Sequence, residues 1–401
     1  MEDQDHRVIA RRMDLFHQQE EGQGMIFWHP RGFAVYQLIE GEIRRRMRAA
    51  GFAEVRTPQL LDRSLWEASG HWQKFSKEMF VFEDGADTDE GARQLALKPM
   101  SCPGHVQIFK SRLRSFRDLP LRLAEFGACM RNEPSGALLG LMRTRAFVQD
   151  DAHIFCLEEQ VEEEVANFCR LLQAVYARFG FDDVAVGLST RPEERAGENA
   201  VWDRAEDMLA VAATAAGLKF ALQPGEGAFY GPKLEFVLRD RKGRSWQCGT
   251  IQVDLVLPER LDAVFAASDG ARKRPVMLHQ AVLGSIERFL GVLLEHHAGK
   301  LPFWLAPDQV AVASIGPEQA AYAEALVADL KAAGLRAVAD VRSERLAKKV
   351  HDARQLGIPA FLAVGAQEVA NGTAALRRED GGPLQIPGEE LAAYFGSEAE
   401  A

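Results

Sequence analysis

Several features that would place a chain in a simple class are missing from this 401-residue sequence. The longest apolar runs, 289–294 and 361–364, are far shorter than the roughly 20 residues of a membrane helix, so we expect no bilayer span. The start is acidic and mixed in charge, unlike a secretory signal or a transit peptide, which predicts a cytoplasmic location. Hydrophobic residues make up 47 % and charged residues 26 %, a balance that excludes disorder and collagen-like structure.

Cysteine is also scarce, and positively charged residues are outnumbered by negatively charged ones. The chain has 5 cysteines and no CxxC pair, which predicts buried thiols or metal ligands in place of a disulfide framework. A net charge of −10 argues against a protein that coats nucleic acid by bulk charge. It leaves room for a local basic track, for which the candidates are Lys110, Arg112, Arg114, Arg117 and Arg122.

The common phosphate-binding motifs are absent. We find no GxxxxGK[ST], no strand-coupled GxGxxG, and neither HRD nor DFG of protein kinases. Two glycine-punctuated segments, 225–236 and 246–255, are predicted strands and suit either a sheet interior or a pocket wall. The alternation of side chains in the second segment places four of them on one face: Cys248, Thr250, Gln252 and Asp254.

Length and patterning predict two domains, 1–302 and 303–401, divided at PFWLAP. The second is predicted as a small α/β unit with strands at 310–315, 335–341 and 360–365 and helices at 317–333 and 344–356. In the first, a helix is expected to end at Gly51, before an extended segment that contains Pro58. The acidic stretch 83–92 is expected to be a mobile loop.

The most informative strand is 143–155, RTRAFVQDDAHIF. One face is mostly apolar, with Asp150 as its one charged side chain, and the other carries Arg143, Arg145, Phe147, Gln149, Asp151, His153 and Phe155. Upstream, Arg131 and Glu133 share a face before a turn, so the two segments form a predicted hairpin with a long loop. A solvated sheet edge with cross-strand ion pairs also explains this pattern, and Arg145 suits that role best.

A second arginine is expected inside an apolar helix at 278–295. Arg288 has small neighbours at helical spacing, namely Gly284, Ser285 and Gly291, which leave room beside its guanidinium. A buried arginine requires an anionic partner, and its fork suits a carboxylate or a phosphate. The partner is either a ligand or a glutamate elsewhere in the core.

Cys102, His153 and His279 are candidate metal ligands. Their separations fit no local zinc motif, so each is also explained as an ordinary core or solvated residue. As a set, three protein ligands would leave zinc one open position, as reactive and substrate-binding zinc sites require.

Taken in order, these segments resemble the class II aminoacyl-tRNA synthetases, and within them the threonyl family. GFAEVRTP resembles the first class motif, with Pro58 at a dimer interface; RNEPSG through LMRTRAF resembles the second, and LGSIERF the third. GHW, KPMSCPGHVQIF, QDDAHIFC, GEGAFYGPK and QCGTIQVD resemble the threonyl type. The likeness runs from Asp5 into the C-terminal unit and implies an α+β catalytic domain with an antiparallel sheet, followed by an α/β anticodon-binding domain.

The resemblance implies ATP-dependent activation of L-threonine and its transfer to tRNA(Thr) by a homodimer, with one Zn²⁺ per subunit and Mg²⁺ with ATP. It assigns catalysis to Arg131, Arg288, Lys233 and His71, and ATP binding to Arg131, Glu133, Arg143, Gln247 and Arg288. It assigns threonine binding to Met100, Gln149, Asp151, Tyr230 and Gln252, and the metal to Cys102, His153 and His279. It places Glu368 and Arg377 at the anticodon.

The same resemblance raises the question of editing. A site that binds a hydroxyl rejects valine by roughly 10⁴ to 10⁵, whereas serine lacks only a methyl group, worth roughly 1 to 3 kcal/mol. Many members of the family carry an N-terminal domain that removes misattached serine, but this sequence starts directly on the catalytic segment. We therefore expect no editing in cis and a separate enzyme that clears Ser-tRNA.

Some positions depart from the family pattern. Ala137, Leu139, Ala146 and Val148 replace serine, histidine, glycine and threonine, and Ser343 replaces an asparagine that helps to read the anticodon. These departures leave two rivals open: a paralogous enzyme that adenylates an amino acid for a carrier protein or another acceptor, and a non-catalytic RNA-binding paralogue. The presence of Arg131, Arg288 and the metal trio weighs against the second rival.

Overall fold

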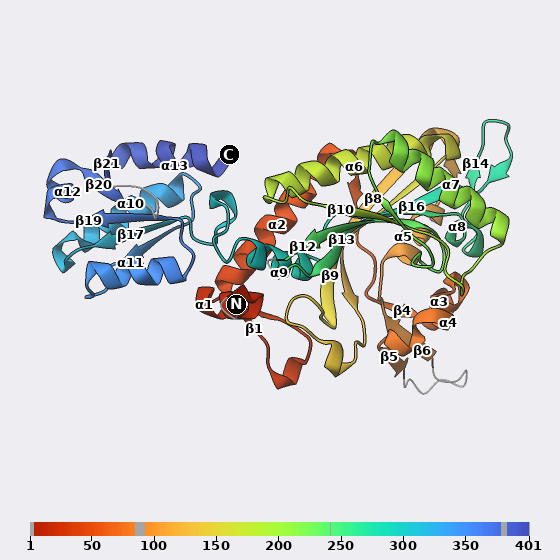
Figure 1. The fold of residues 1–401 in the computed structure, drawn as a ribbon, viewed down its shortest axis with the longest axis horizontal. Helices are drawn as coiled ribbons and strands as arrows, with labels where there is room; N and C mark the ends of the chain where they lie inside the picture. Colours follow the sequence, from red (N-terminus) through yellow and green to blue (C-terminus); the bar gives the residue numbers. More distant parts are fainter. Residues whose placement is uncertain (1–3, 85–92, 241, 378–382, 401) are drawn as a thin grey trace. The chain divides into compact units, whose positions relative to one another are not determined.

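The computed structural model describes residues 4–84, 93–240, 242–377 and 383–400 (Figure 1). Two compact units interleave along the chain: one is Gln18–Ile26 with Glu40–Leu293, and the other is Met1–His17, Phe27–Ile39 and Leu294–Ala401. The division at residues 302 and 303 stays a prediction. Most of the predicted acidic loop, 85–92, lies outside the described residues. No helix within the described ranges is long and apolar enough to cross a membrane.

The larger unit is built on an eight-stranded sheet. Its strands run in the order β11 (Ala221–Gln223), β10 (Ala185–Ser189), β12 (Lys233–Arg239), β13 (Ser245–Asp254), β16 (Val276–Ala281), β9 (Ala146–Cys156), β8 (Leu121–Met130) and β3 (Ala53–Glu54). The pairs are antiparallel except for the outermost two, β10 with β11 and β3 with β8. The antiparallel character expected for this domain is confirmed.

Helices cover both faces of this sheet. On one face lie α6 (Val161–Arg178) and α7 (Asn199–Ala215), which Figure 1 shows running across the strands. The buried side chains of α6 recur at helical spacing, from Val161 through Val165 and Phe168 to Leu172, so they form one apolar stripe against the sheet. On the other face, α5 (Cys102–Lys110) packs Phe109 against Phe155 of β9, with ring centroids 4.4 Å apart.

Shorter elements complete this unit. They are β4 (Leu60–Asp62), β5 (Val81–Asp84) and β6 (Arg93–Leu97), which form one sheet; β7 (Arg114–Ser115), β14 (Phe265–Ala266) and β15 (Arg272–Lys273), which form another; and the helices α3 (Arg63–Ser69), α4 (His71–Phe75) and α8 (Leu257–Arg260). The helix predicted to end at Gly51 is α2 (Pro30–Ala49), and Gly51 has a φ of 81°, a left-handed conformation that glycine adopts without strain.

The register of the central strands places polar side chains from separate segments in one row. Lys233 of β12 pairs with Gln252 of β13, Gln252 with His279 of β16, and His279 with His153 of β9. Paired residues of antiparallel strands point to the same face with Cβ atoms about 5 Å apart. The sheet therefore aligns these four side chains although they are far apart in the sequence.

The predicted hairpin is confirmed, and its charged exception now has a reason. β8 and β9 pair from Leu121 with Phe155 to Met130 with Ala146. Asp150 is buried and accepts hydrogen bonds from the backbone N–H groups of residues 282, 283 and 284 at 2.7, 2.9 and 3.0 Å. A carboxylate occupies the apolar face because it holds the loop before α9 (Ile286–His296).

The helix predicted over 278–295 is wrong in its first part. Residues Val276–Ala281 form β16, and α9 begins only at Ile286. β16 is buried between neighbouring strands, so its sequence lacks the alternation that marks a half-exposed strand, and a short apolar run does not distinguish a strand from a buried helix. Gly284, with a φ of 80°, lies in the loop that separates the two elements.

In the second unit, the α/β pattern predicted from the sequence is confirmed. A five-stranded sheet runs in the order β18 (Ala337–Asp340), β17 (Val310–Ser314), β19 (Ala360–Val364), β20 (Thr373–Arg377) and β21 (Leu384–Pro387). Val310 and Val312 face the core shared with α10 (Ala320–Ala332) and α13 (Leu391–Glu400), whereas Ala311 and Ala313 face α11 (Leu346–Gln355). The unit also contains α1 (His6–Met13), β1 (Phe16–His17), β2 (Phe27–Trp28) and α12 (Ala366–Asn371).

Candidate functional site

The row of polar side chains lines a cavity of about 400 Å³ in the larger unit. Its lining includes every residue predicted for catalysis or binding in that unit except His71: Met100, Cys102, Arg131, Glu133, Arg143, Gln149, Asp151, His153, Tyr230, Lys233, Gln247, Gln252, His279 and Arg288. His71 lies directly behind the cavity, with its Nε2 atom 3.6 Å from Cys102 Sγ. The cavity therefore gathers residues from seven helices and strands of the chain and from the loops beside them.

Cys102, His153 and His279 converge at one end of this cavity. One potential ligand atom from each lies within 4.8 Å of the other two, and all three side chains are buried. His153 and His279 come from neighbouring positions of the sheet, and Cys102 starts α5 on the opposite wall. The three groups are close enough to bind one ion.

The hydrogen bonds of the two imidazoles define which nitrogens face each other. His279 Nε2 lies 2.8 Å from Asp254 Oδ2, and because a carboxylate accepts, this nitrogen carries the proton. His279 Nδ1 therefore presents its lone pair to His153 Nε2, 3.1 Å away. Two tetrahedral zinc ligands at about 2.05 Å from the metal lie about 3.3 Å apart, so this separation suits a bridging cation. A set of one thiolate and two imidazoles fits zinc with one open position.

Burial acts strongly on these groups. It raises the pKa of the Cys102 thiol, and the nearby carboxylates of Asp151 and Asp254 act in the same direction. It lowers the pKa of His153 well below its usual value and lowers that of His71 to about 3. The imidazoles of His153 and His71 are thus neutral, and neutral imidazole is the form that binds metal, whereas the thiol requires a nearby cation to ionise.

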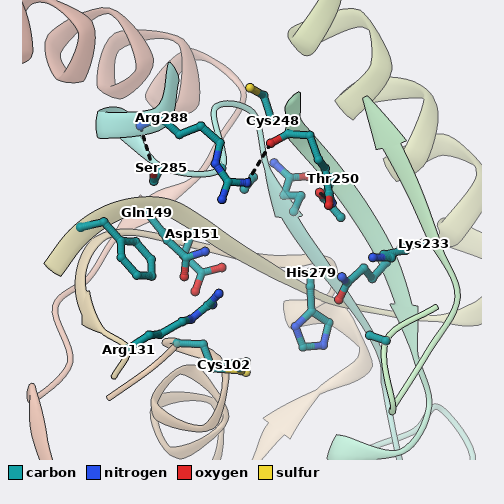
Figure 2. Close-up of a pocket in the computed structure, with 18 of the residues that line it drawn as sticks. Cys102, Arg131, Gln149, Asp151, Lys233, Cys248, Thr250, His279, Ser285 and Arg288 are labelled. Carbon is teal, nitrogen blue, oxygen red and sulfur yellow. Dashed lines mark hydrogen bonds between the residues drawn. The ribbon is translucent and has the colours of Figure 1, made fainter. Parts of the chain in front are cut away.

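Three guanidinium groups gather at the other end of the cavity. Arg288 donates to the backbone carbonyls of Met142 at 3.0 Å and Gln247 at 3.2 Å. Burial lowers the pKa of Arg288, and the positive charges of Arg131 and Arg143 lower it further. Among the described residues no carboxylate forms an ion pair with Arg288, so the alternative of a glutamate partner in the core is not supported. In Figure 2, Arg288 and Arg131 reach the cavity from opposite sides of Gln149 and Asp151.

The other two arginines have contacts that fix their direction. Arg131 donates to the carbonyl of Pro99 at 3.2 Å and lies over the ring of Phe147, 5.1 Å from its centroid. Arg143 forms an ion pair with Glu133 at 2.9 Å, which is the type of cross-strand pair expected of a solvated hairpin. Three cations beside a single close carboxylate make this end of the cavity suited to an anionic ligand.

A polar pocket lies between the two ends. Tyr230 donates from its hydroxyl to Gln252 Oε1 at 2.8 Å, and its ring lies 4.9 Å from that of His279. Asp151 accepts a hydrogen bond from the backbone N–H of Ser101 at 3.2 Å, and burial raises the pKa of its carboxyl. Lys233, in the same row, forms an ion pair with Glu235 at 2.5 Å. These groups supply both donors and acceptors for a small polar molecule.

Some residues that shape the site were not singled out for a role from the sequence. Glu287 is buried on α9 and accepts a hydrogen bond from the backbone N–H of Val148 at 3.0 Å. His105 lies with its Nδ1 2.8 Å from His153 Nδ1, and Glu125 lies behind His105. Asp150, which holds the loop before α9, also had no assigned role, but the sequence did mark it as the one charged side chain on a mostly apolar face.

The proposed basic track is not continuous. Lys110 donates to the carbonyl of Leu261, Arg114 is buried and donates to the carbonyl of Phe109, and Arg122 is paired with Glu164. Three of its five members are thus paired with other parts of the protein. We therefore assign no nucleic-acid surface to this track.

In the second unit, Glu368 and Arg377 lie near one another. Glu368 Oε2 accepts from the backbone N–H of Gly365 at 2.9 Å and its Oε1 from Gln385 at 2.9 Å. These hydrogen bonds lower the pKa of Glu368, as does the nearby charge of exposed Arg377.

Comparison with known proteins assigns the family. Residues 80–297 match the model of the class II tRNA synthetase core domain (G, H, P, S and T), and residues 309–397 match an anticodon-binding domain. Threonine–tRNA ligase of Rhodospirillum rubrum is 56 % identical over 385 residues, 96 % of this chain, and that of Cupriavidus pinatubonensis is 59 % identical over 367 residues, 92 % of this chain. The chain belongs to the threonine–tRNA ligase family of class II synthetases.

Solved structures of this family have the same fold. The structure of the RNA binding domain of threonyl-tRNA synthetase from Cryptosporidium parvum superposes with a TM-score of 0.93 at 39 % identity, over 98 % of each chain. A putative threonyl-tRNA synthetase from Aeropyrum pernix has a TM-score of 0.86 at 29 % identity, over 99 % of this chain and 96 % of that one. This chain spans 59 % of the length of the Rhodospirillum rubrum protein and 57 % of the Cupriavidus pinatubonensis protein.

Proposed function

We propose that this chain activates L-threonine with ATP and transfers the threonyl group to tRNA(Thr). The observation that carries the proposal is the convergence of Cys102, His153 and His279 at one end of a cavity whose other end is lined by three guanidinium groups. The first end suits an amino alcohol and the second a polyphosphate. A cavity that offers both binding ends fits an enzyme that joins an amino acid to a nucleotide.

The arginines would act by electrostatic stabilisation. When the carboxylate of threonine attacks the α-phosphorus, pyrophosphate leaves, and negative charge spreads over the phosphate oxygens. We assign Arg131 to the α-phosphate and the threonine carboxylate, and Arg143 and Arg288 to the γ-phosphate. Glu133 and Gln247 would contact the nucleotide, and Lys233 would support the activation step. Mg²⁺ would accompany ATP.

Threonine selection would depend on the other end of the cavity. Cys102, His153 and His279 would hold Zn²⁺, which supplies an open coordination position for the amino and hydroxyl groups of the substrate. Asp151 would pair with the amino group, while Tyr230, Gln252, Gln149 and Met100 would enclose the side chain. Valine would leave polar groups unpaired, whereas serine would lose only the contacts of one methyl group. We therefore expect this chain to form Ser-tRNA slowly, with removal by a separate enzyme.

Transfer would involve parts of the chain beyond the activation site. We assign His71 to the terminal ribose of the tRNA, and Glu368 and Arg377 to the anticodon, within a domain spanning 303–401. A homodimer of such chains in the cytoplasm completes the proposal. Ala137, Leu139 and Ser343 are the positions at which tRNA contacts would differ from the family pattern.

Two assays test the proposed function. Threonine-dependent pyrophosphate exchange measures activation, and aminoacylation of tRNA(Thr) transcript measures transfer. We expect both activities. Exchange without charging would instead support an enzyme that passes an adenylated amino acid to another acceptor, and the absence of exchange would contradict the proposal.

A further inference from the structure

Behind the proposed metal ligands lies a buried group of polar side chains centred on Glu125. Its carboxylate accepts from Lys98 Nζ at 2.7 Å, from the backbone N–H and the hydroxyl of Thr57 at 3.0 and 2.8 Å, and from His105 Nε2 at 3.2 Å. Glu125, Lys98 and His105 are 3 %, 1 % and 0 % exposed. The cavity of the proposed active site includes none of these four residues in its lining.

The carboxylate of Glu125 determines which nitrogen of His105 carries a proton. Burial by itself would raise the pKa of Glu125, but the hydrogen bonds from His105 and Lys98 lower it to about 2, so the group is an acceptor only. His105 Nε2 must therefore donate to Glu125. In the neutral imidazole, this arrangement leaves the lone pair of His105 Nδ1 directed at His153, whose Nδ1 lies 2.8 Å away.

The tautomer of His105 in turn determines the tautomer of His153. Its Nδ1 donates to the lone pair of His105, which leaves the lone pair of its Nε2 facing His279 Nδ1, 3.1 Å away. In His279, the hydrogen bond from Nε2 to Asp254 likewise leaves the lone pair of Nδ1 facing His153. Each of the two histidines thus has its own buried partner. His279 is paired directly with the carboxylate of Asp254, and His153 is paired with the imidazole of His105, which is in turn paired with the carboxylate of Glu125.

We propose that His105, oriented by Glu125, is a positioning residue that holds His153 in the tautomer and ring orientation needed to bind the metal. This inference rests on the proposed metal-binding role of the trio. Such outer partners of ligating histidines generally contribute 10- to 100-fold to metal affinity. His105 would therefore affect zinc retention and, through it, threonine recognition, without touching metal or substrate.

Packing alone is the competing explanation for His105. Its ring meets that of His153 edge to face, with centroids 4.6 Å apart at 82°, so it also fills space beside the ligand. Two substitutions separate packing from hydrogen bonding. His105→Gln can donate its amide N–H to Glu125 and offer its oxygen to His153, whereas His105→Leu removes both interactions. Glu125 keeps Lys98 and Thr57 in either variant, so its charge stays paired.

The experiment measures zinc affinity of the full chain by competition with a chromophoric chelator, and the visible spectrum of the Co²⁺-substituted protein. Circular dichroism establishes that each variant is folded. We expect His105→Leu to lose about 10- to 100-fold in zinc affinity with an altered Co²⁺ spectrum, and His105→Gln to stay within about threefold of the parent.

The outcomes are distinguishable. If the parent chain binds zinc and His105→Leu binds it equally well, the positioning role is overturned while the proposed function stands. If both variants lose affinity to the same extent, ring shape rather than hydrogen bonding is responsible, and the inference is overturned as well. If the parent chain itself binds no zinc, the metal-dependent part of the proposed function fails together with the inference.

Discussion

Glu287 on α9 accepts a hydrogen bond from the backbone N–H of Val148 on β9, over 3.0 Å. Two residues along β9, Asp150 accepts from the three backbone N–H groups that precede α9. The helix that carries Arg288 and the strand that carries Asp151 therefore hold each other through two buried carboxylates. This reciprocal contact holds the helix of Arg288, at one end of the proposed active site, against the strand that also carries His153 of the other end.

Asp150→Asn tests the first of these contacts. Asparagine offers one acceptor oxygen where three N–H groups require two, and its own N–H₂ group would face donors. We expect a loss of about 1–3 kcal/mol in the free energy of unfolding and a raised KM for ATP as Arg288 loses its position. Chemical denaturation and pyrophosphate exchange measure these effects. The exposed Asp183→Asn is the control, and an unchanged Asp150→Asn protein would contradict the assignment.

Glu287→Gln tests the second contact through pH. Burial raises the pKa of Glu287 to about 7, so its protonated form favours folding and this contribution is lost as the pH rises through 7. Between pH 6 and pH 8 the parent should lose about 1.4 kcal/mol that the variant retains, because Gln keeps an acceptor for Val148 without a titrating proton. Urea unfolding at both pH values measures the difference. Equal pH dependence of the variant and the parent would show that Glu287 does not titrate between pH 6 and pH 8. The exposed Glu193→Gln serves as the control.

Asp254→Asn should disturb the proposed metal site from its other side. Asp254 Oδ1 accepts from two backbone N–H groups, at 2.7 and 2.9 Å, and an asparagine oxygen can replace it there. The amide N–H₂ group would then face His279 Nε2 and favour the tautomer with a proton on Nδ1, which cannot bind metal. We expect a folded protein with about 10- to 100-fold weaker zinc binding. Zinc affinity equal to that of the parent would refute this account of the His279 tautomer.

Arg288→Lys should reduce activation more than it reduces stability. A lysine keeps the charge but loses the planar fork that the backbone carbonyls of Met142 and Gln247 orient. We expect a decrease in kcat for pyrophosphate exchange of about 10²- to 10³-fold, the usual loss when one oriented donor is removed from a transition state. Arg272→Lys, at an exposed position, serves as the control. Activity near that of the parent would exclude Arg288 from the reaction.

Much of the site could be predicted from the sequence because side chains alternate between the two faces of a strand. Alternation along 143–155 identified the face that carries Gln149, Asp151 and His153, and the cavity lining includes all three. Alternation along 246–255 likewise placed Thr250 and Gln252 on one common face, and the structure shows that both line the cavity. Within one strand, the identity of the residues is enough to define a face.

Pairing between distant strands could not be predicted in the same way. The alignment of His153, His279 and Gln252 depends on the register of β9, β16 and β13, which are separated in sequence by helices and loops. The burial of β16 also concealed its strand character, and we predicted a helix there. His105 carried no signal because its role depends on a contact with His153 that exists only after the sheet has formed.

The most direct test of the central claim is threonine-dependent pyrophosphate exchange with and without a zinc chelator, using valine and serine as comparators. We predict exchange with threonine, weak exchange with serine, almost none with valine, and loss of threonine-dependent exchange on metal removal that added Zn²⁺ restores. Exchange that persists in the metal-free chain with threonine still preferred over valine would contradict the claim that Cys102, His153 and His279 select the substrate through one ion.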